Sequence, residues 1–159
     1  MEVTFAPRDI LQIDDARITY RNFEGKGTKY NREGDRNFVW IIPDEELADR
    51  LTNLGWNVKV KPPREEGDTP FMYLPVKVKF SNNGPYVYLS TPVNHTKLDE
   101  DMIGMLDDIE IDSVSLDIRP YDWEVQGKAG RTAYLQSMEV HQRMDRFAAR
   151  YAAEEHPEE

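Results

Sequence analysis

The chain has no cysteine and no long hydrophobic run, and both absences narrow the choice of protein class. Without cysteine there is neither a disulfide framework nor a thiolate metal site, so nothing favours an oxidising compartment. No stretch approaches the roughly 20 apolar residues that cross a bilayer, and the first residues lack a secretory signal pattern. We therefore expect a cytoplasmic protein without membrane contact.

Patterns for catalysis and nucleotide binding are also scarce. Gly25-Lys26-Gly27-Thr28 has the residue types of a phosphate-binding loop but not its GxxxxGK[ST] spacing. The three histidines, His95, His141 and His156, lie far apart with no paired ligand pattern, and no serine lies in a nucleophile elbow. The sequence predicts no enzyme, no cofactor and no metal.

One spacing partly matches a calcium loop. Its first, third, sixth, ninth and twelfth places are held by Asp99, Asp101, Gly104, Asp107 and Glu110. Ile103 occupies the fifth place, where an oxygen ligand is required. The favoured interpretation is an acid-started helix from Leu98 to Leu106, and a calcium-dependent structural protein is the weakest of three alternatives.

Charge is distributed unevenly along the chain. The net charge is -10, which opposes nucleic-acid binding because Lys and Arg contacts to phosphates supply most of the affinity. Residues 17–79, however, hold 12 Lys/Arg against 10 Asp/Glu, whereas residues 80–159 hold 7 against 16. A basic face can therefore exist on the amino-terminal half.

Short runs of aromatic and β-branched residues, broken by Gly, Pro and Asn, predict a mainly β protein. The expected strands are Ala16 to Phe23, Arg36 to Ile42, Trp56 to Lys61, Met72 to Phe80, Tyr86 to Leu89, Ile109 to Arg119 and Gly130 to Val140. The first of three helices follows Asp44, a good cap, and ends at Gly55. The second is the segment from Leu98 to Leu106, and the third runs from Gln142 to Ala153. We expect one domain over residues 1–153 and a solvated acidic tail over residues 154–159.

Strand alternation predicts which side chains meet solvent. From Met72 to Phe80, the even-numbered apolar residues share one face, and Tyr73, Lys77 and Lys79 share the other. The segment from Trp56 to Lys61 likewise turns Lys59 and Lys61 outward. Two neighbouring strands of this kind would form a lysine stripe.

Both faces of the segment from Arg36 to Ile42 are apolar, so alternation does not decide its orientation. Phe38 and Trp40 share the face that bears the rings, and we expect that face to be a working surface rather than core. Tyr86 and Tyr88 likewise share a face opposite Val87.

Basic residues interleaved with aromatic residues are the strongest functional signal. Single-stranded nucleic acid requires this mixture, because flat rings stack on exposed bases while cations follow the backbone. The alternative for any single ring is ordinary sheet packing. The predicted DNA contacts are Arg21, Phe23, Lys26, Lys29, Tyr30, Arg32, Arg36, Phe38, Trp40, Lys59, Lys61, Tyr73, Lys77, Lys79, Tyr86, Tyr88, Trp123, Lys128 and Arg131.

Four segments together resemble the OB-fold single-stranded DNA-binding proteins of bacteriophages. They are Arg21-Asn22-Phe23-Glu24-Gly25, Tyr30-Asn31-Arg32-Glu33-Gly34-Asp35-Arg36-Asn37-Phe38, Gly55-Trp56-Asn57-Val58-Lys59, and the stretch from Arg119 through Gly127-Lys128-Ala129-Gly130 to Leu135. The resemblance implies a five-stranded Greek-key barrel with added helices, which coats single strands without sequence preference in replication or recombination. It also implies a final hairpin that turns near residues 126–130.

Two features depart from that family: the last residues of the tail, and the strongly acidic carboxy-terminal half, which suits a protein that releases DNA readily or one whose tail competes for its own groove. The tail ends Pro157-Glu158-Glu159 rather than with an apolar residue, so recruitment of replication or recombination proteins by the tail is in doubt. The acidic tail can instead compete with DNA for the basic groove. The rival to DNA binding is a protein-binding module on the same fold, with Trp40, Tyr86 and Tyr88 as its patch.

Overall fold

The computed structural model describes residues 1–144, 147 and 150 of the chain. The described elements are β1 (Glu2–Phe5), η1 (Pro7–Asp9), β2 (Leu11–Ala16), β3 (Ile18–Asn22), β4 (Arg36–Ile41), α1 (Glu45–Asn53), β5 (Lys59–Lys61), β6 (Phe71–Val78), β7 (Tyr86–Ser90), β8 (His95–Leu98), η2 (Ile103–Asp107), β9 (Ile111–Val125) and β10 (Lys128–Gln142). The mainly β class predicted from the sequence is confirmed. Among the described residues, no helix is long and apolar enough to span a bilayer.

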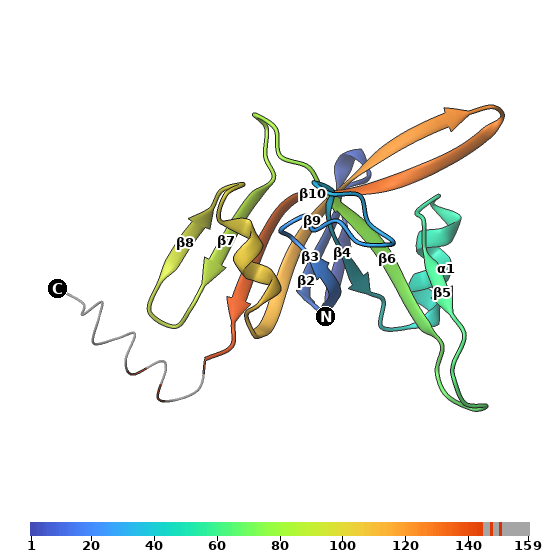
Figure 1. The fold of residues 1–159 in the computed structure, drawn as a ribbon. Helices are drawn as coiled ribbons and strands as arrows, with labels where there is room; N and C mark the ends of the chain where they lie inside the picture. Colours follow the sequence, from blue (N-terminus) through green and yellow to red (C-terminus); the bar gives the residue numbers. More distant parts are fainter. Residues whose placement is uncertain (145–146, 148–149, 151–159) are drawn as a thin grey trace.

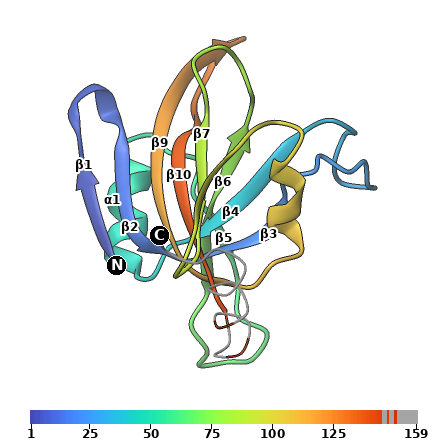
Figure 2. The same cartoon turned by 90° about the vertical axis from the view of Figure 1, so that its left-hand side faces the viewer.

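The strands form a single bent sheet (Figures 1 and 2). Its main path runs β1-β2-β9-β10-β6-β4-β3, with β5 paired to β6, β7 to β10 and β8 to β7. Within the described residues this path ends at β1 and β3 without closing. The pairing therefore does not confirm a five-stranded barrel.

β10 connects the two halves of the sheet. β9 pairs along its whole length on one edge, while the other edge pairs first with β6 at Ala133 and Tyr134 and then with β7 from Ser137 to His141. A register shift between Leu135 and Ser137 separates the two partners. β6 and β7 thus follow one another along the same edge, and their outward faces belong to one surface.

Beyond the body of the sheet, β9 and β10 continue as a two-stranded arm over residues 120–132 (Figure 1). The arm turns through Gln126 and Gly127, both of which have positive φ angles, as the tight hairpin turn requires. This turn lies at the place that the resemblance implies.

Register explains why the rings of β4 are buried, contrary to the sequence-based expectation. Phe38 pairs with Val76, and Trp40 pairs with Leu74, so both rings lie on the side that β6 buries. Phe38 and Trp40 are fully buried, and Phe23 stacks on Phe38 inside the same core. The outward side of β4 is the one with Asn37, Val39 and Ile41.

The first helix has the ends predicted for it. The Asp44 carboxylate accepts a hydrogen bond from the Leu47 amide at 2.7 Å, and Ala48 and Leu51 are buried. Gly55, with a φ of 94°, follows the last turn. Asp44 and Gly55 therefore bound the helix as local signals indicate.

Three segments differ from expectation. Residues 2–16 form a hairpin, β1 with β2, where no strand was predicted. Residues 98–106 hold the end of β8 and the short 3₁₀ helix η2 instead of one helix, because β8 gains a partner in β7. Gln142 ends β10, so the third predicted helix does not begin there; the remainder of it and the acidic tail lie mostly outside the described residues.

Candidate nucleic-acid interface

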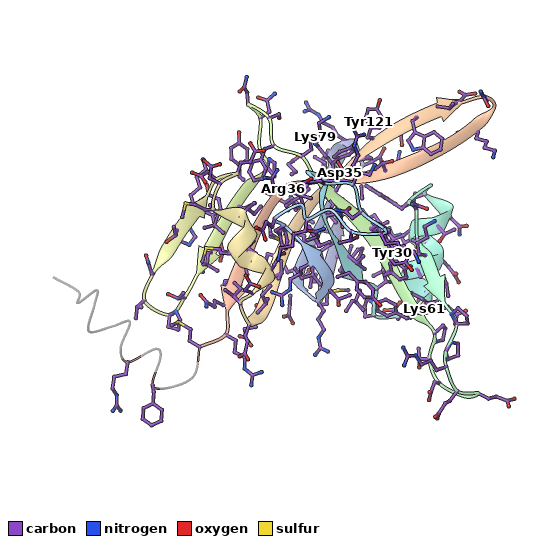
Figure 3. All side chains as sticks on the ribbon, viewed as in Figure 1. Tyr30, Asp35, Arg36, Lys61, Lys79 and Tyr121 are labelled. Carbon is purple, nitrogen blue, oxygen red and sulfur yellow. The ribbon has the colours of Figure 1, made fainter. Side chains whose placement is uncertain are left out.

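The outward side of β4, β5, β6 and the adjoining part of β10 carries exposed lysines and half-buried rings. We call it the lysine face. Its members are Asn37, Val39 and Ile41 on β4, Lys59 and Lys61 on β5, Phe71, Tyr73, Pro75 and Lys77 on β6, Tyr134 on β10, Arg119 on β9, and Lys79 just after β6. Figure 3 shows Lys61 and Lys79 toward opposite ends of β6, with Arg36 near Lys79.

Sheet register aligns these side chains in rows. One row contains Asn37, Lys77 and Tyr134, with Arg119 opposite Tyr134 on β9. A second row contains Ile41, Tyr73 and Lys59. Both rows combine a cation with a ring.

The lysines of this face are free to meet a ligand. Lys59, Lys61, Lys77 and Lys79 are exposed, and none of them takes part in an ion pair within the part of the chain that the structure describes. Placing them on the outer face by alternation is therefore correct. Four unpaired cations along two neighbouring strands create a positive strip on a protein whose total charge is negative.

Aromatic rings gather at the Phe71 end of β6. Phe71 stacks on Tyr73 with centroids 5.0 Å apart, and Tyr20 meets the edge of Phe71 at 6.2 Å. Tyr20 is 61% exposed. Beside them lies a hollow of about 440 Å³, lined by Tyr20, Ile41, Phe71, Lys61 and Arg64 among others.

A second hollow, of about 690 Å³, lies between the lysine face and the loop of residues 24–35. Lys77, Lys79, Phe80 and Tyr134 line one side of it. Tyr30 lines the other side and is 90% exposed. Both hollows have the size of a ligand pocket, and they open on the same face.

Hydrogen bonds of two asparagines fix the shape of this loop. The side-chain Nδ2 of Asn31 donates to the carbonyl oxygens of Lys26, Arg32 and Asp35 at 2.9–3.2 Å. The side-chain Oδ1 of Asn31 accepts from Asn37 Nδ2 at 2.9 Å. Asn22 Oδ1 accepts from the amides of Gly25 and Lys26. The loop therefore presents Tyr30 from a hydrogen-bonded scaffold that Asn37 joins to the lysine face.

Six predicted contact residues are buried or already engaged. The rings of Phe23, Phe38 and Trp40 lie in the core and cannot stack on a base. Arg21 Nη1 donates to the carbonyls of Leu106 and Ile109, which anchors η2 on β3. Arg36 pairs with Glu100 at 3.0 Å, and its guanidinium lies over the Phe80 ring.

Arg131, the sixth, holds the base of the arm. Its Nε donates to Asp122 at 2.7 Å, Nη2 lies 3.3 Å from Asp9, and its guanidinium lies 5.3 Å from the Trp56 ring. The hydrogen bond from Arg131 lowers the pKa of Asp122 and raises that of Arg131 itself. Arg131 is thus a structural cation rather than a free one.

The other predicted contacts occupy three places. Lys26, Lys29, Tyr30 and Arg32 lie on the loop of residues 24–35, where Lys26 pairs with Glu24 and Lys29 approaches the Tyr30 ring. Trp123 and Lys128 lie on the arm. Tyr86 and Tyr88 lie on β7, on the far side of the Leu135–Ser137 register shift.

The outward side of β7 and β8 forms what we call the tyrosine face, made of Tyr86, Tyr88, Ser90, His95 and Lys97 with Glu139 and His141 of β10. The side chains of this face interact with one another. Tyr88 stacks on His95, Ser90 lies 2.7 Å from His95 Nδ1, and Lys97 lies over Tyr86. Glu139 pairs with His141 at 3.1 Å.

Sequence reasoning missed three members of the lysine face, Phe71, Arg119 and Tyr134, and also Tyr20, whose ring contacts Phe71. Tyr134 lies between the buried Ala133 and Leu135, so alternation alone places it outward. Phe71 was missed because the predicted strand began at Met72, whereas β6 begins at Phe71. Arg119 lies over the Tyr134 ring at 4.9 Å, a contact that requires the β9–β10 register.

The calcium-loop residues do not assemble a metal site. The Asp107 carboxylate accepts the amides of Phe23 and Glu24, and Asp99 accepts the amide of Met102. Across the described ranges, no cluster of three or more His, Asp or Glu side chains could hold a metal ion.

A family model described as a putative phage ssDNA-binding domain matches residues 2–158, nearly the whole chain. The chain belongs to this family. The resemblance deduced from the four sequence segments is thereby confirmed, whereas comparison with curated proteins finds no match.

Solved structures of similar fold agree with this family of phage ssDNA-binding domains. The single-stranded DNA-binding protein from bacteriophage Enc34, in complex with ssDNA, superposes with a TM-score of 0.57 at 14% identity, covering 90% of this chain and 92% of that one. A second structure of the single-stranded DNA-binding protein from bacteriophage Enc34 gives a TM-score of 0.54 at 16% identity, covering 90% of this chain and 86% of that one. At these identities the likeness concerns the fold.

Proposed function

We propose that the chain binds single-stranded DNA along the lysine face, without sequence preference, by stacking bases on rings and pairing phosphates with lysines. The observation that carries the proposal is the row structure of that face, in which exposed, unpaired lysines lie beside half-buried rings on adjacent strands. Stacking on a ring is indifferent to base identity, and a lysine contacts any phosphate.

The two hollows suggest the course of the strand. The Phe71 end, with Tyr20, Tyr73 and Lys61, provides one stacking region. The hollow under Tyr30, with Lys77, Lys79 and Tyr134, provides the other. A strand that follows β6 passes through both regions and meets Lys59 between them.

An OB-like barrel, open between β1 and β3, and a role in phage replication or recombination in the host cytoplasm remain parts of this proposal. The family and the ssDNA complex of the Enc34 protein support it. A domain over residues 1–153 with an acidic tail that opposes DNA binding also stays a prediction. The rival module for a protein partner loses Trp40 from its patch, because that ring is buried.

Fluorescence anisotropy of a labelled oligo(dT) tests the proposal. We expect tight binding at low salt, weaker binding to a duplex of equal length, and steep loss of affinity as salt rises. Absence of binding at low salt, or equal affinity for duplex, would refute it. Label anisotropy is preferable to tryptophan emission, because Trp40 and Trp56 are buried.

A further inference from the structure

The arm exposes an apolar face that the proposed DNA site does not use. Tyr121, Trp123 and Val125 lie on one side of β9 and are 55%, 39% and 59% exposed. Trp123 lies against Gly130, where a Cβ would overlap its ring, and its Nε1 donates to Thr132 Oγ1. The ring is therefore held in place on the ribbon and presented outward, and contiguous exposed apolar side chains of this kind mark interaction sites.

The charge of the arm favours a protein over DNA. Asp122 and Glu124 balance Lys128 and Arg131, and Arg131 is already paired with Asp122. A DNA-binding ribbon requires net positive charge, which this one lacks. Lys128, opposite Val125 at the tip, is the cation that remains without an ion pair among the described residues.

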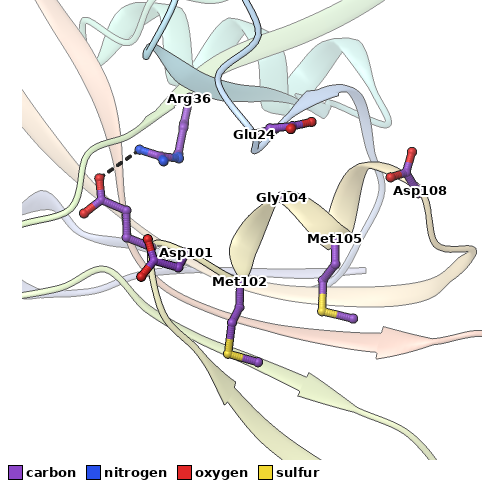
Figure 4. A pocket seen from close by; sticks show the side chains of 8 residues that line it. Glu24, Arg36, Asp101, Met102, Gly104, Met105 and Asp108 are labelled. Atoms are coloured by element: carbon purple, nitrogen blue, oxygen red, sulfur yellow. Dashed lines mark hydrogen bonds and ion pairs between the residues drawn. The ribbon is translucent and has the colours of Figure 1, made fainter.

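A surface of complementary character lies on η2. Met102 and Met105 are 43% and 41% exposed, and they extend from the same side of η2 (Figure 4). They line a hollow of about 600 Å³ with Gly104, Arg36 and four carboxylates, from Glu24, Glu100, Asp101 and Asp108. Arg36 neutralises Glu100, so the hollow offers exposed thioethers inside an acidic rim.

The two surfaces lie apart in the molecule. In Figure 1 the arm extends to the upper right, away from the body of the sheet, whereas η2 lies left of the centre, and Arg21 of β3 holds it there. One copy therefore cannot bring its own arm to its own η2 hollow. A contact between the two surfaces joins different copies, and because it is head-to-tail it leaves a free arm and a free hollow at the ends of each chain of copies.

We infer that the arm of one copy binds the η2 hollow of the next copy when the protein lines a single strand. Trp123 and Val125 contact Met102 and Met105, and Lys128 pairs with the carboxylates of the rim. Flexible thioethers adapt well to an aromatic partner. This inference rests on the proposed DNA binding, which brings the copies side by side.

Two complementary variants test it. The first, Val125→Ser with Lys128→Glu, impairs the arm, and the second, Met102→Ser with Met105→Ser, impairs the hollow. Val93→Ser with Lys97→Glu makes the same changes as the first on the β7–β8 hairpin and serves as the control. All six side chains are exposed, so we expect these substitutions to leave the fold and its stability nearly unchanged.

Mass photometry of the full chain on a short oligo(dT) that holds one copy, and on a long one, gives the readout. We expect wild type and control to bind the long DNA in clusters, with affinity per site higher by about tenfold than on the short DNA. Each impaired variant should bind the short DNA normally and lose that gain. A 1:1 mixture of the two should form pairs, and carbodiimide should cross-link Lys128 to Asp101 or Asp108 between wild-type copies.

The contradicting results are distinct. Impaired variants that cluster like wild type would overturn the contact between copies. If the arm variant instead binds the short DNA more weakly, the arm contacts DNA, and the inference is wrong. If wild type binds neither DNA, the proposed function itself fails.

Discussion

The lysine face and the tyrosine face contain the same types of residue in different states. Both faces belong to the outward side of one sheet and are joined through β10. On the tyrosine face, Tyr88 and His95 stack on each other, and Lys97 lies over Tyr86. On the lysine face, four lysines have no carboxylate partner among the described residues. The rings of the lysine face also contact neighbours, Phe71 with Tyr73 and Arg119 with Tyr134. The two faces therefore differ in the pairing of their cations, which composition does not reveal.

Charge reversal on the two faces should give the largest difference. We expect Lys77→Glu with Lys79→Glu to weaken oligo(dT) binding at low salt on the order of 100-fold, because two phosphate contacts become repulsions. The melting temperature should stay nearly unchanged, since both side chains are exposed. Anisotropy titration and thermal denaturation measure the two effects. Lys97→Glu is the control, and an equal loss in that variant would remove the distinction between the faces.

Removal of one ring from each face should have a smaller effect. Tyr73→Ala should cost about 1–3 kcal/mol of binding free energy, the range for one stacked base. Tyr88→Ala should cost much less, because Tyr88 lies on the tyrosine face, beyond the Leu135–Ser137 register shift and away from the four unpaired lysines. Titration of both variants with the same oligo(dT) makes the comparison, and the reverse order would place the strand on the tyrosine face.

The asparagine of the loop offers a third test. Asn31→Ala removes the hydrogen bonds that shape residues 24–35 but touches neither lysine nor ring of the lysine face. We expect binding to weaken by about 1 kcal/mol, since the loop must then be ordered by the DNA. Asn94→Ala alters the β7–β8 turn and should leave affinity unchanged. Combining Asn31→Ala with Tyr30→Ala should add little to Tyr30→Ala alone, and full additivity would contradict a positioning role.

The smallest effect concerns the base of the arm. The lowered pKa of Asp122 stabilises the folded state above the carboxyl's ordinary pKa near 3.8, and this contribution declines below that value and is lost as pH falls through the lowered pKa of the folded state. Asp122→Asn should therefore lower the melting temperature slightly at pH 7 and by less at pH 3. Scanning fluorimetry at both pH values measures the difference in melting temperature between wild type and Asp122→Asn. A larger difference at pH 3 than at pH 7 would contradict this sign.

Local signals predicted what depends on neighbours in sequence. The Asp44 cap, the stop at Gly55 and the outward direction of Lys77 follow from helix ends and strand alternation, and the structure has them all. The β1–β2 hairpin was not predicted, because this segment contains Pro7, Asp9, Asp14 and Asp15, and proline and aspartate are uncommon in strands. In fact Arg8, Asp9 and Asp15 take up the turns with positive φ angles.

Facts that depend on partners distant in sequence could not be predicted. Both faces of β4 are apolar, and only its register with β6 decides that Trp40 lies on the core side and Ile41 on the opposite side. Arg131 is basic in sequence, yet Asp9 and Asp122 neutralise it across 122 and 9 residues. The apolar residues of 98–106 have helical spacing, but Leu98 pairs with Val87 of β7 and therefore belongs to the strand β8.

The salt dependence of oligo(dT) binding tests the central claim most directly, because its log-log slope counts phosphate contacts at about 0.7 each on a single strand. We predict that Lys77→Gln with Lys79→Gln reduces the magnitude of the slope by about 1.4, the value for two lost contacts, whereas Lys97→Gln leaves it unchanged. A slope that stays the same in the double variant, or falls equally in the control, would show that the DNA does not lie on the lysine face.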